Sequence, residues 1–237
     1  MTSIRDQYEK VWLAKATDEP AGGPIDRWAV TLAEMRPAER LLDLGCGDGR
    51  ATAAARPPAR LVVGAEVSVH ACRFALARGV RAVACSGDEP GLPFRGETFD
   101  AVTCLDVIEH VLDPLHLMKE LERVLEPGGT AYVATVNMRY LKYLWRLAVE
   151  GVFPATSDDV EPYDGGHLHY FTAESIRRLG RQAGLRPVRH VGTIPSGRLR
   201  LLQPLRRWYA VREFLAAGFV IVFTKPQRGV TTRVGDR

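Results

Sequence analysis

The stretch LLDLGCGDG at residues 41–49 decides the fold. A short apolar run, typical of a buried strand, leads directly into glycines at positions 45, 47 and 49. Glycine lets the backbone turn tightly and approach a ligand with no Cβ in the way. Position 50 is Arg50, so the spacing is GxGxG and not the GxGxxG of a dinucleotide-binding loop. Asp43 before the first glycine suits an ammonium group or a bound water better than a pyrophosphate.

Outward from this stretch, apolar runs alternate with segments of helical spacing. Strands are predicted at 40–44, 61–66, 80–85, 99–105, 130–136, 187–192 and 218–224. Helices are predicted at 4–16, 25–35, from 52 to 55, 69–78, 114–125 and 173–183. Near-continuous apolar strands separated by helices predict a parallel sheet with helices on both faces. Ligands of such sheets bind at the carboxyl ends of the strands.

Composition narrows the class of protein. The chain has 237 residues, of which 46% are hydrophobic and 25% charged, so we expect one globular domain over 1–237 and exclude disorder as its main state. No apolar run reaches the length of a membrane span, and residues 1–12 do not have the pattern of a secretory signal. The four cysteines form no CxxC pair, which predicts buried, reduced thiols and a cytoplasmic protein.

Charge is distributed unevenly along the chain. Residues 1–176 hold 18 Lys and Arg against 26 Asp and Glu, whereas residues 177–237 hold 14 against 2. A basic tail on an acidic body indicates either an anionic partner or a tail that folds back on its own body, and we favour the second.

Acidic residues follow the second and third predicted strands. Glu66 ends the second strand, 19 residues after Gly47, where a carboxylate can accept both hydroxyls of a ribose. Asp88 and Glu89 follow the third strand, where a carboxylate can accept the amino group of adenine. A capping or solvated carboxylate is the alternative at each position. The glycine loop, Glu66 and Asp88 follow three successive predicted strands, and together they favour a ligand that contains a nucleoside.

These motifs resemble those of the class I S-adenosylmethionine-dependent methyltransferases over about residues 38–225. The matching stretches are LLDLGCGDG (41–49), VVGAEVS (62–68), GDEPGLPF (87–94), FDAVTCLDVIEHV (99–111) and LERVLEPGGTAYVATVN (121–137). Within the family the chain is most similar to MetW-like and ubiquinone-biosynthesis-type small-molecule enzymes. The resemblance implies an α/β fold with a doubly wound seven-stranded sheet, order 3-2-1-4-5-7-6, whose last strand is antiparallel.

The resemblance also implies S-adenosylmethionine as cofactor and S-adenosylhomocysteine as product. Asp43 would hold the methionine amino group and Leu105 would offer it a backbone carbonyl. Glu66 would bind the ribose, and Asp88 would read the adenine amino group. The full set of cofactor residues implied in this way is Asp43, Gly45, Gly47, Glu66, Val67, Asp88, Glu89 and Leu105.

Methyl transfer from a sulfonium needs an oriented nucleophile, a dry site and a base for its proton. Histidine is the natural base near neutral pH. We predict His110, just after the fourth strand, and His169, just before the helix at 173–183, as catalytic residues. The alternative for each is a structural, hydrogen-bonded histidine.

A metal site is an alternative for the same region. Asp106, Glu109 and His110 have i, i+3, i+4 spacing, and a later histidine (His167 or His169) could complete a divalent site. Some quinone-type and RNA-end methyltransferases carry a similar ExxEH with metal. Here the first position is Asp, and metal-free relatives also carry an EH pair, so we predict no metal.

The remaining segments are expected to select the substrate. Residues 1–37 would form a helical cap and residues 138–172 a lid over the substrate side. Residues 197–215 have the pattern of a basic amphipathic helix, either on a membrane surface or, as we favour, packed over the sheet. We predict that the protein methylates a small-molecule acceptor, on oxygen more readily than on nitrogen. Nucleic acid is not expected as a partner, and the sequence is compatible with a homodimer. The rivals are a MetW-like activator of a partner enzyme and an RNA methyltransferase.

Overall fold

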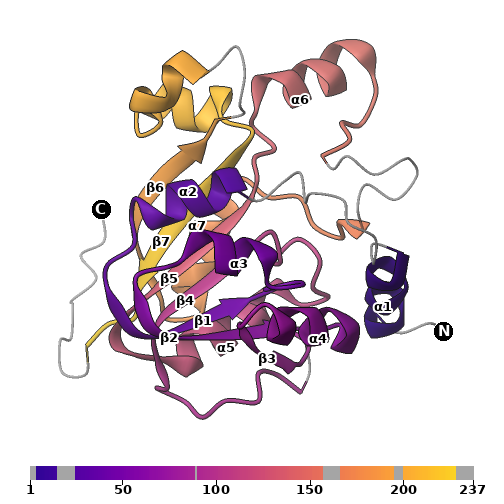
Figure 1. The fold of residues 1–237 in the computed structure, drawn as a ribbon. Coiled ribbons are helices and arrows are strands. Elements are labelled where there is room, and N and C mark those ends of the chain that lie inside the picture. Colours follow the sequence, from indigo (N-terminus) through magenta and orange to yellow (C-terminus); the bar gives the residue numbers. More distant parts are fainter. Residues whose placement is uncertain (1–3, 15–24, 89, 157–165, 195–199, 228–237) are drawn as a thin grey trace.

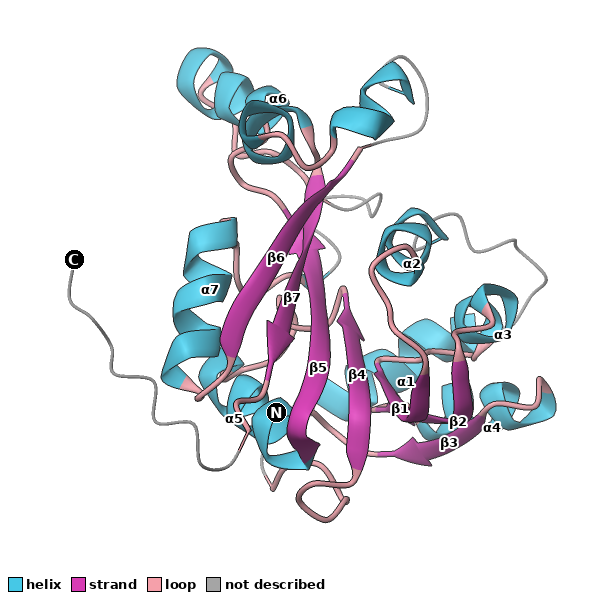
Figure 2. Ribbon diagram, turned by 90° about the vertical axis from the view of Figure 1, so that its left-hand side faces the viewer, coloured by secondary structure: helices cyan, strands magenta, loops and turns pink. Residues whose placement is uncertain are grey.

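The computed structural model describes residues 4–14, 25–88, 90–156, 166–194 and 200–227. One seven-stranded sheet runs through this part of the chain in the order β3-β2-β1-β4-β5-β7-β6 (Figures 1 and 2). Strands β1 to β5 are parallel to one another, and β7 is antiparallel to both β5 and β6. The predicted strand order and antiparallel last strand are therefore confirmed. The strands are β1 Ala38–Leu44, β2 Ala59–Glu66, β3 Arg81–Ala84, β4 Phe99–Leu105, β5 Leu125–Val136, β6 Arg186–Thr193 and β7 Gly218–Thr224.

Helices cover both faces of this sheet. The α-helices are α1 Ile4–Ala14, α2 Ile25–Leu32, α3 Arg50–Ala55, α4 Val69–Ala77, α5 Pro114–Val124, α6 Leu141–Trp145 and α7 Ala173–Gln182. On one face, α5 and α7 pack against the sheet through Leu117, Leu121 and Ile176, all fully buried. On the other, α2 and α3 contribute Trp28 and Ala51 to a second apolar cluster. These two apolar clusters hold the helices against the sheet and so fix the positions of the strand ends, where the candidate site lies.

The structure departs from the predicted elements at β5. The sequence placed the start of this strand at 130, after Pro127-Gly128-Gly129, but β5 begins at Leu125, which is in register with Phe99. A Cβ at position 129 would lie within 3.1 Å of two backbone oxygens and of the Leu125 side chain. The strand therefore continues through this turn only because glycine fits there.

Two helical regions also differ from the prediction. Residues 141–150, which the sequence left without regular structure in the lid, form α6 and a π-helix, η1 Arg146–Glu150. Residues 197–215 do not form one amphipathic helix. Their described part forms a 3-10 helix, η3 Arg200–Leu205, and a π-helix, η4 Val211–Leu215, and Leu201 and Trp208 on the expected packing face are exposed. Pro204 inside η3 removes a backbone donor, which is consistent with the break.

Much of the basic tail folds back on the acidic body. Arg189 and Arg207 both pair with Glu34, and the Lys225 ammonium lies 3.2 Å from a carboxylate oxygen of Glu122. Burial raises the pKa of Glu34, but its two arginine partners outweigh this and lower the pKa overall. These ion pairs agree with the expectation that the basic tail folds back on the acidic body of the same chain.

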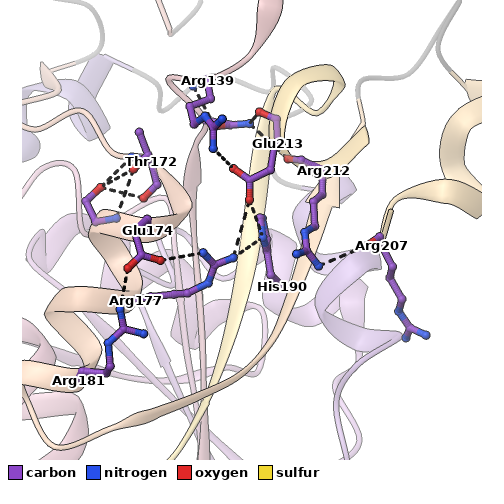
Figure 3. A network of polar contacts seen from close by, with 11 residues as sticks. Arg139, Thr172, Glu174, Arg177, Arg181, His190, Arg207, Arg212 and Glu213 are labelled. Carbon is purple, nitrogen blue, oxygen red and sulfur yellow. Dashed lines mark hydrogen bonds and ion pairs between the residues drawn. The ribbon is translucent and has the colours of Figure 1, made fainter. Parts of the chain in front are cut away.

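A buried polar network joins α7, β6 and η4 (Figure 3). Arg177 donates to Nδ1 of His190 over 2.7 Å, and Arg139 pairs with Glu213 over 2.9 Å. Thr172 caps α7 by accepting from the Ser175 backbone, while the Ser175 hydroxyl accepts from the Thr172 backbone. The network fixes the carboxyl-terminal strands against the helix that covers them.

The four cysteines are buried and unbonded, as predicted. Among the described residues, no helix has the length and apolar character needed to cross a membrane.

Candidate functional site

One cavity lies at the carboxyl ends of the parallel strands, next to α1. Its volume is about 200 Å³. Predicted site residues from four chain segments contribute to its wall, and among the described residues no Lys or Arg lines it. The predicted residues that line it are Gly45, Gly47, Glu66, Val67, Asp88 and His110.

The loop after β1 forms the floor of the cavity. Gly45 has a φ of +76°, and a Cβ there would lie 2.2 Å from Cγ2 of Val107. The loop after β1 and the loop after β4 thus approach more closely than any side chain at position 45 permits. Glycine is required here by both backbone conformation and packing.

Glu66 binds the same loop through its carboxylate. Oε2 accepts from the Gly47 backbone over 3.0 Å, and Oε1 accepts from Val67 and Ser68 over 2.8 and 3.1 Å. Burial raises the pKa of Glu66 more than these three donors lower it. Each carboxylate oxygen can accept more than one hydrogen bond, so a Glu66 carboxylate that lines the cavity can also accept from a ligand hydroxyl.

Asp88 fixes the next strand end. Its Oδ1 accepts from the Leu112 backbone over 2.8 Å, which holds the segment before α5 against the end of β3. The side chain lines the cavity beside Ser86 and Gly87. Glu89, the predicted neighbour in adenine recognition, lies outside the described residues.

Asp43 and Leu105 lie behind the cavity wall and do not line it. Asp43 is buried, and its carboxylate accepts from the hydroxyls of Thr52 and Thr103. Burial, with a smaller contribution from Glu66, raises the pKa of Asp43 to about 6. In this structure Asp43 braces the glycine loop between β4 and α3, and its predicted contact with a methionine ammonium stays a prediction, as does that of Leu105.

His110 faces the cavity and contacts the end of the lid. Its Nδ1 lies 3.2 Å from the Gly166 carbonyl oxygen. Since a carbonyl can only accept, this contact places a proton on Nδ1 and the lone pair of the neutral ring on Nε2. The His167 ring lies 4.7 Å from the His110 ring, and Nδ1 of His167 lies 2.7 Å from the Thr156 hydroxyl.

His169, the other predicted base, does not line the cavity. Its ring stacks on Phe171 with a centroid distance of 5.9 Å, and its backbone donates to the Glu109 carbonyl. The structure therefore brings His167, and not His169, next to His110.

Glu109 is fully buried beside His110. Neither of its carboxylate oxygens has a hydrogen-bond partner of normal geometry among the described residues. Burial and the neighbouring Asp106 raise the pKa of Glu109 to about 8. One ligand atom each from Glu109, His110 and His167 lies within 4.8 Å of the others, so these three are the residues that could hold a divalent cation. Asp106, the fourth candidate from the sequence, pairs instead with Arg27 over 2.5 Å.

Sequence analysis missed the residues that α1 and α2 bring to the site. Tyr8 and Trp12 of α1 line the cavity, and the Trp12 ring would lie 2.9 Å from a Cβ at Gly47. Burial, with Glu66 and Glu109, raises the pKa of Tyr8. The i, i+4 spacing of these two aromatic residues indicates one helix face, but not what that face covers. Arg27 of α2 pairs with Asp106. The two residues are far apart in the sequence, and no local sequence pattern indicates this contact.

Comparison with known proteins agrees with this architecture. Residues 16–190 match the family described as "Methyltransferase domain". A ubiquinone biosynthesis O-methyltransferase of Thiobacillus denitrificans is 29% identical over 171 residues, which is 67% of this chain and 69% of the relative. A demethylmenaquinone methyltransferase of Corynebacterium kroppenstedtii is 33% identical over 152 residues, which is 61% of this chain and 62% of the relative. The matches thus leave about a third of each relative's length uncovered.

Solved structures share the fold. A methyltransferase of Haloferax volcanii, in complex with the activator Trm112, superposes with a TM-score of 0.68 at 22% identity, covering 95% of this chain and all of that one. The N-methyltransferase NodS of Bradyrhizobium japonicum, in complex with S-adenosylhomocysteine, gives a TM-score of 0.62 at 16% identity, covering 95% and 100%. At these identities the likeness concerns the fold.

Strand order, the cavity at the strand ends and the family match lead to one assignment: the chain belongs to the class I S-adenosylmethionine-dependent methyltransferases. The charge of the cavity wall suits that cofactor. S-adenosylmethionine carries a sulfonium and an ammonium. The described part of the wall presents the carboxylates of Glu66 and Asp88, as well as Asp106, which pairs with Arg27, and it contains no lysine or arginine. Gly45 and Gly47 both line the cavity, and their lack of a Cβ lets the loop pass close to Val107 and Trp12.

Proposed function

We propose that the enzyme transfers the methyl group to a small-molecule acceptor, with a hydroxyl oxygen as the leading nucleophile. The observation that carries the proposal is the position of His110 in the wall of the same cavity as Glu66 and Asp88. The names of the two curated relatives, an O-methyltransferase and a demethylmenaquinone methyltransferase, support a small acceptor and, in the first case, oxygen.

The proposed roles follow from the contacts of each residue. Glu66 accepts from the ribose hydroxyls, and Asp88 and Val67 lie against the adenine. When bound, S-adenosylmethionine supplies an activated methyl group. His110, held by the Gly166 carbonyl with its lone pair on Nε2, takes the proton of the acceptor hydroxyl. The lid at 138–172 and the cap at 1–37 exclude water and shape the acceptor site.

The test combines turnover with cofactor binding. The purified chain is incubated with S-adenosylmethionine and either phenols or primary amines, and formation of S-adenosylhomocysteine is measured. We expect product with a phenol and none with the amines. Turnover confined to amines would exclude oxygen as the nucleophile, and cofactor binding without turnover on either class would contradict this acceptor class.

Glu66→Gln probes the cofactor half of the proposal. Replacing a charged acceptor by a neutral one weakens hydrogen bonds to hydroxyls, so we expect the dissociation constant of S-adenosylmethionine to rise about tenfold in calorimetric titration. Glu39→Gln is the matched control, because the Glu39 side chain is 73% exposed and pairs with Arg60 away from the cavity. If the two variants bound S-adenosylmethionine with equal affinity, Glu66 would not be part of the cofactor site.

Metal dependence is tested with the same assay. We expect methyl transfer to persist in excess chelator and the purified protein to contain no divalent metal, because His110 acts as a base in this proposal. Loss of turnover on chelation, restored by a divalent cation in the parent chain but not in His167→Ala, would assign Glu109, His110 and His167 to a metal instead.

A further inference from the structure

Exposed apolar side chains concentrate on two segments of the molecule. Ten of the eighteen large apolar residues that are exposed in the described part belong to residues 141–153 or to residues 201–209. We call these ten the apolar ridge: Leu141, Leu144, Trp145, Leu147, Val149, Val152, Phe153, Leu201, Trp208 and Tyr209. Isolated exposed apolar residues are ordinary, but a concentration of this kind marks a binding surface.

The helical part of the ridge has no packing of its own. Neither α6 nor η1 contains a buried residue, although together they form ten continuous helical residues. Helices of this length are marginal in water unless an apolar face is covered. The segment therefore needs a partner that covers its apolar side chains.

The pattern of α6 and η1 identifies the chemistry of that partner. Leu141, Leu144, Trp145 and Ala148 follow the i, i+3, i+4 spacing of one helix side, whereas Lys142 and Arg146 recur at i, i+4 on another. A helix with a tryptophan and leucines on one side and basic residues beside them is typical of a segment that lies in the plane of a lipid headgroup layer.

Charge and position support the same partner. Residues 141–153 and 200–209 together hold five Lys and Arg and one acidic residue, Glu150. Arg146 pairs with Glu150 and Arg207 with Glu34, and the net charge of these segments is still positive, so an anionic surface is complementary to them. Both ribbon views place α6 and the η3–η4 region at the same end of the molecule, beyond the ends of β5 and β6 (Figures 1 and 2). The two parts of the ridge can thus meet one surface.

We propose that the apolar ridge docks on the surface of an anionic lipid bilayer. The apolar side chains enter the boundary between headgroups and acyl chains, and Lys142 and Arg146 contact lipid phosphates. This docking involves no residue of the cavity wall, and its test needs no knowledge of the acceptor.

The test is flotation of the full chain with vesicles of phosphatidylcholine alone or mixed with phosphatidylglycerol. We expect binding to the anionic vesicles that weakens as salt is raised. Leu144→Glu/Trp145→Glu should weaken it at least about tenfold, because two apolar side chains lose their burial. Leu76→Glu on α4 is the control, since Leu76 lies outside the ridge and its exposure of 54% falls between the 37% of Leu144 and the 60% of Trp145.

Trp145 gives a second readout. Its emission should shift to shorter wavelength when anionic vesicles are added, and the shift should be smaller in Trp145→Phe. Equal thermal unfolding of the variants and the parent chain verifies that the substitutions leave the fold intact. Absence of binding to anionic vesicles, equal loss in Leu76→Glu, or light scattering that shows a dimer abolished by Leu144→Glu/Trp145→Glu without vesicle binding would overturn the proposal.

Discussion

At the scale of single residues, one contact with the backbone determines the tautomer of His110. Its Nδ1 faces the Gly166 carbonyl, which selects one tautomer and leaves the other ring nitrogen with the lone pair. The same contact fixes the loop at 166–169, whose residues 168 and 169 also donate to the Glu109 carbonyl. His110 is therefore placed both to accept a proton and to hold the end of the lid.

The prediction at this scale is that His110→Asn lowers kcat without changing cofactor affinity. Asparagine can still donate to the Gly166 carbonyl but cannot take a proton, so we expect a loss on the order of a hundredfold or more. The measurement is steady-state kinetics together with calorimetric titration of S-adenosylmethionine. His169→Asn is the comparison, and an equal kcat loss there would give both imidazoles a part in proton transfer.

At the scale of elements, helix α7 packs on β7 with no space to spare. A Cβ at Gly180 would lie 2.1 Å from the Phe223 ring, which is fully buried. Alanine is the better helix former, so propensity alone would predict that Gly180→Ala stabilises the helix. At this position packing outweighs helix propensity, because the Phe223 ring cannot move without disturbing the close-packed interior.

We therefore predict that Gly180→Ala lowers the free energy of unfolding by roughly 1–3 kcal/mol, the usual cost of overpacking a core. Urea unfolding of the variant and the parent chain measures it. Arg178→Ala in the same helix is the control, since 74% of the Arg178 side chain is exposed. A variant at least as stable as the parent would show that the helix can shift away from β7.

The sequence predicted the elements whose signals are local. Strands such as β4 and β7 are near-continuous apolar runs. The residues at the carboxyl ends of the parallel strands could be placed together because parallel strands end at one edge. Contacts between distant segments left no such signal, as with Arg27 and Asp106 or Trp12 and Gly47. The α6 helix was missed because, in the part of the chain that the structure describes, it has no buried residue, and a helix without a buried face has no complete pattern to detect.

For the molecule as a whole, the carboxyl-terminal third depends on a neutral histidine. His190 is buried between α7 and η4, where Arg177 donates to its Nδ1. Burial first, then Arg177 and Arg212, lowers the pKa of His190 to about 3. In the unfolded chain a histidine titrates near 6.5. Between these values the unfolded state binds more protons than the folded state, so stability falls as the pH is lowered.

The whole chain should accordingly lose about 2 kcal/mol of stability from this group between pH 7 and pH 5. His190→Gln retains an acceptor for Arg177 but does not titrate, so its loss over the same range should be smaller by that amount. Urea unfolding at the two pH values, with both proteins, gives the difference. Parallel pH dependences would mean that His190 is charged or accessible in the folded protein.

The contacts of α1 have a consequence for how fast a ligand can reach the cavity. Glu9 accepts from the backbone of Val69 and His70 at the start of α4, while Tyr8 and Trp12 lie against the cavity. The cavity volume of about 200 Å³ beside these side chains is below the roughly 300–1,000 Å³ of typical ligand pockets. We expect that α1 moves away to admit a nucleoside-sized ligand, which breaks the Glu9 contacts. The observed association rate should therefore reach a plateau at high ligand concentration, set by the opening of α1, and the residence time of the bound molecule should depend on residue 9.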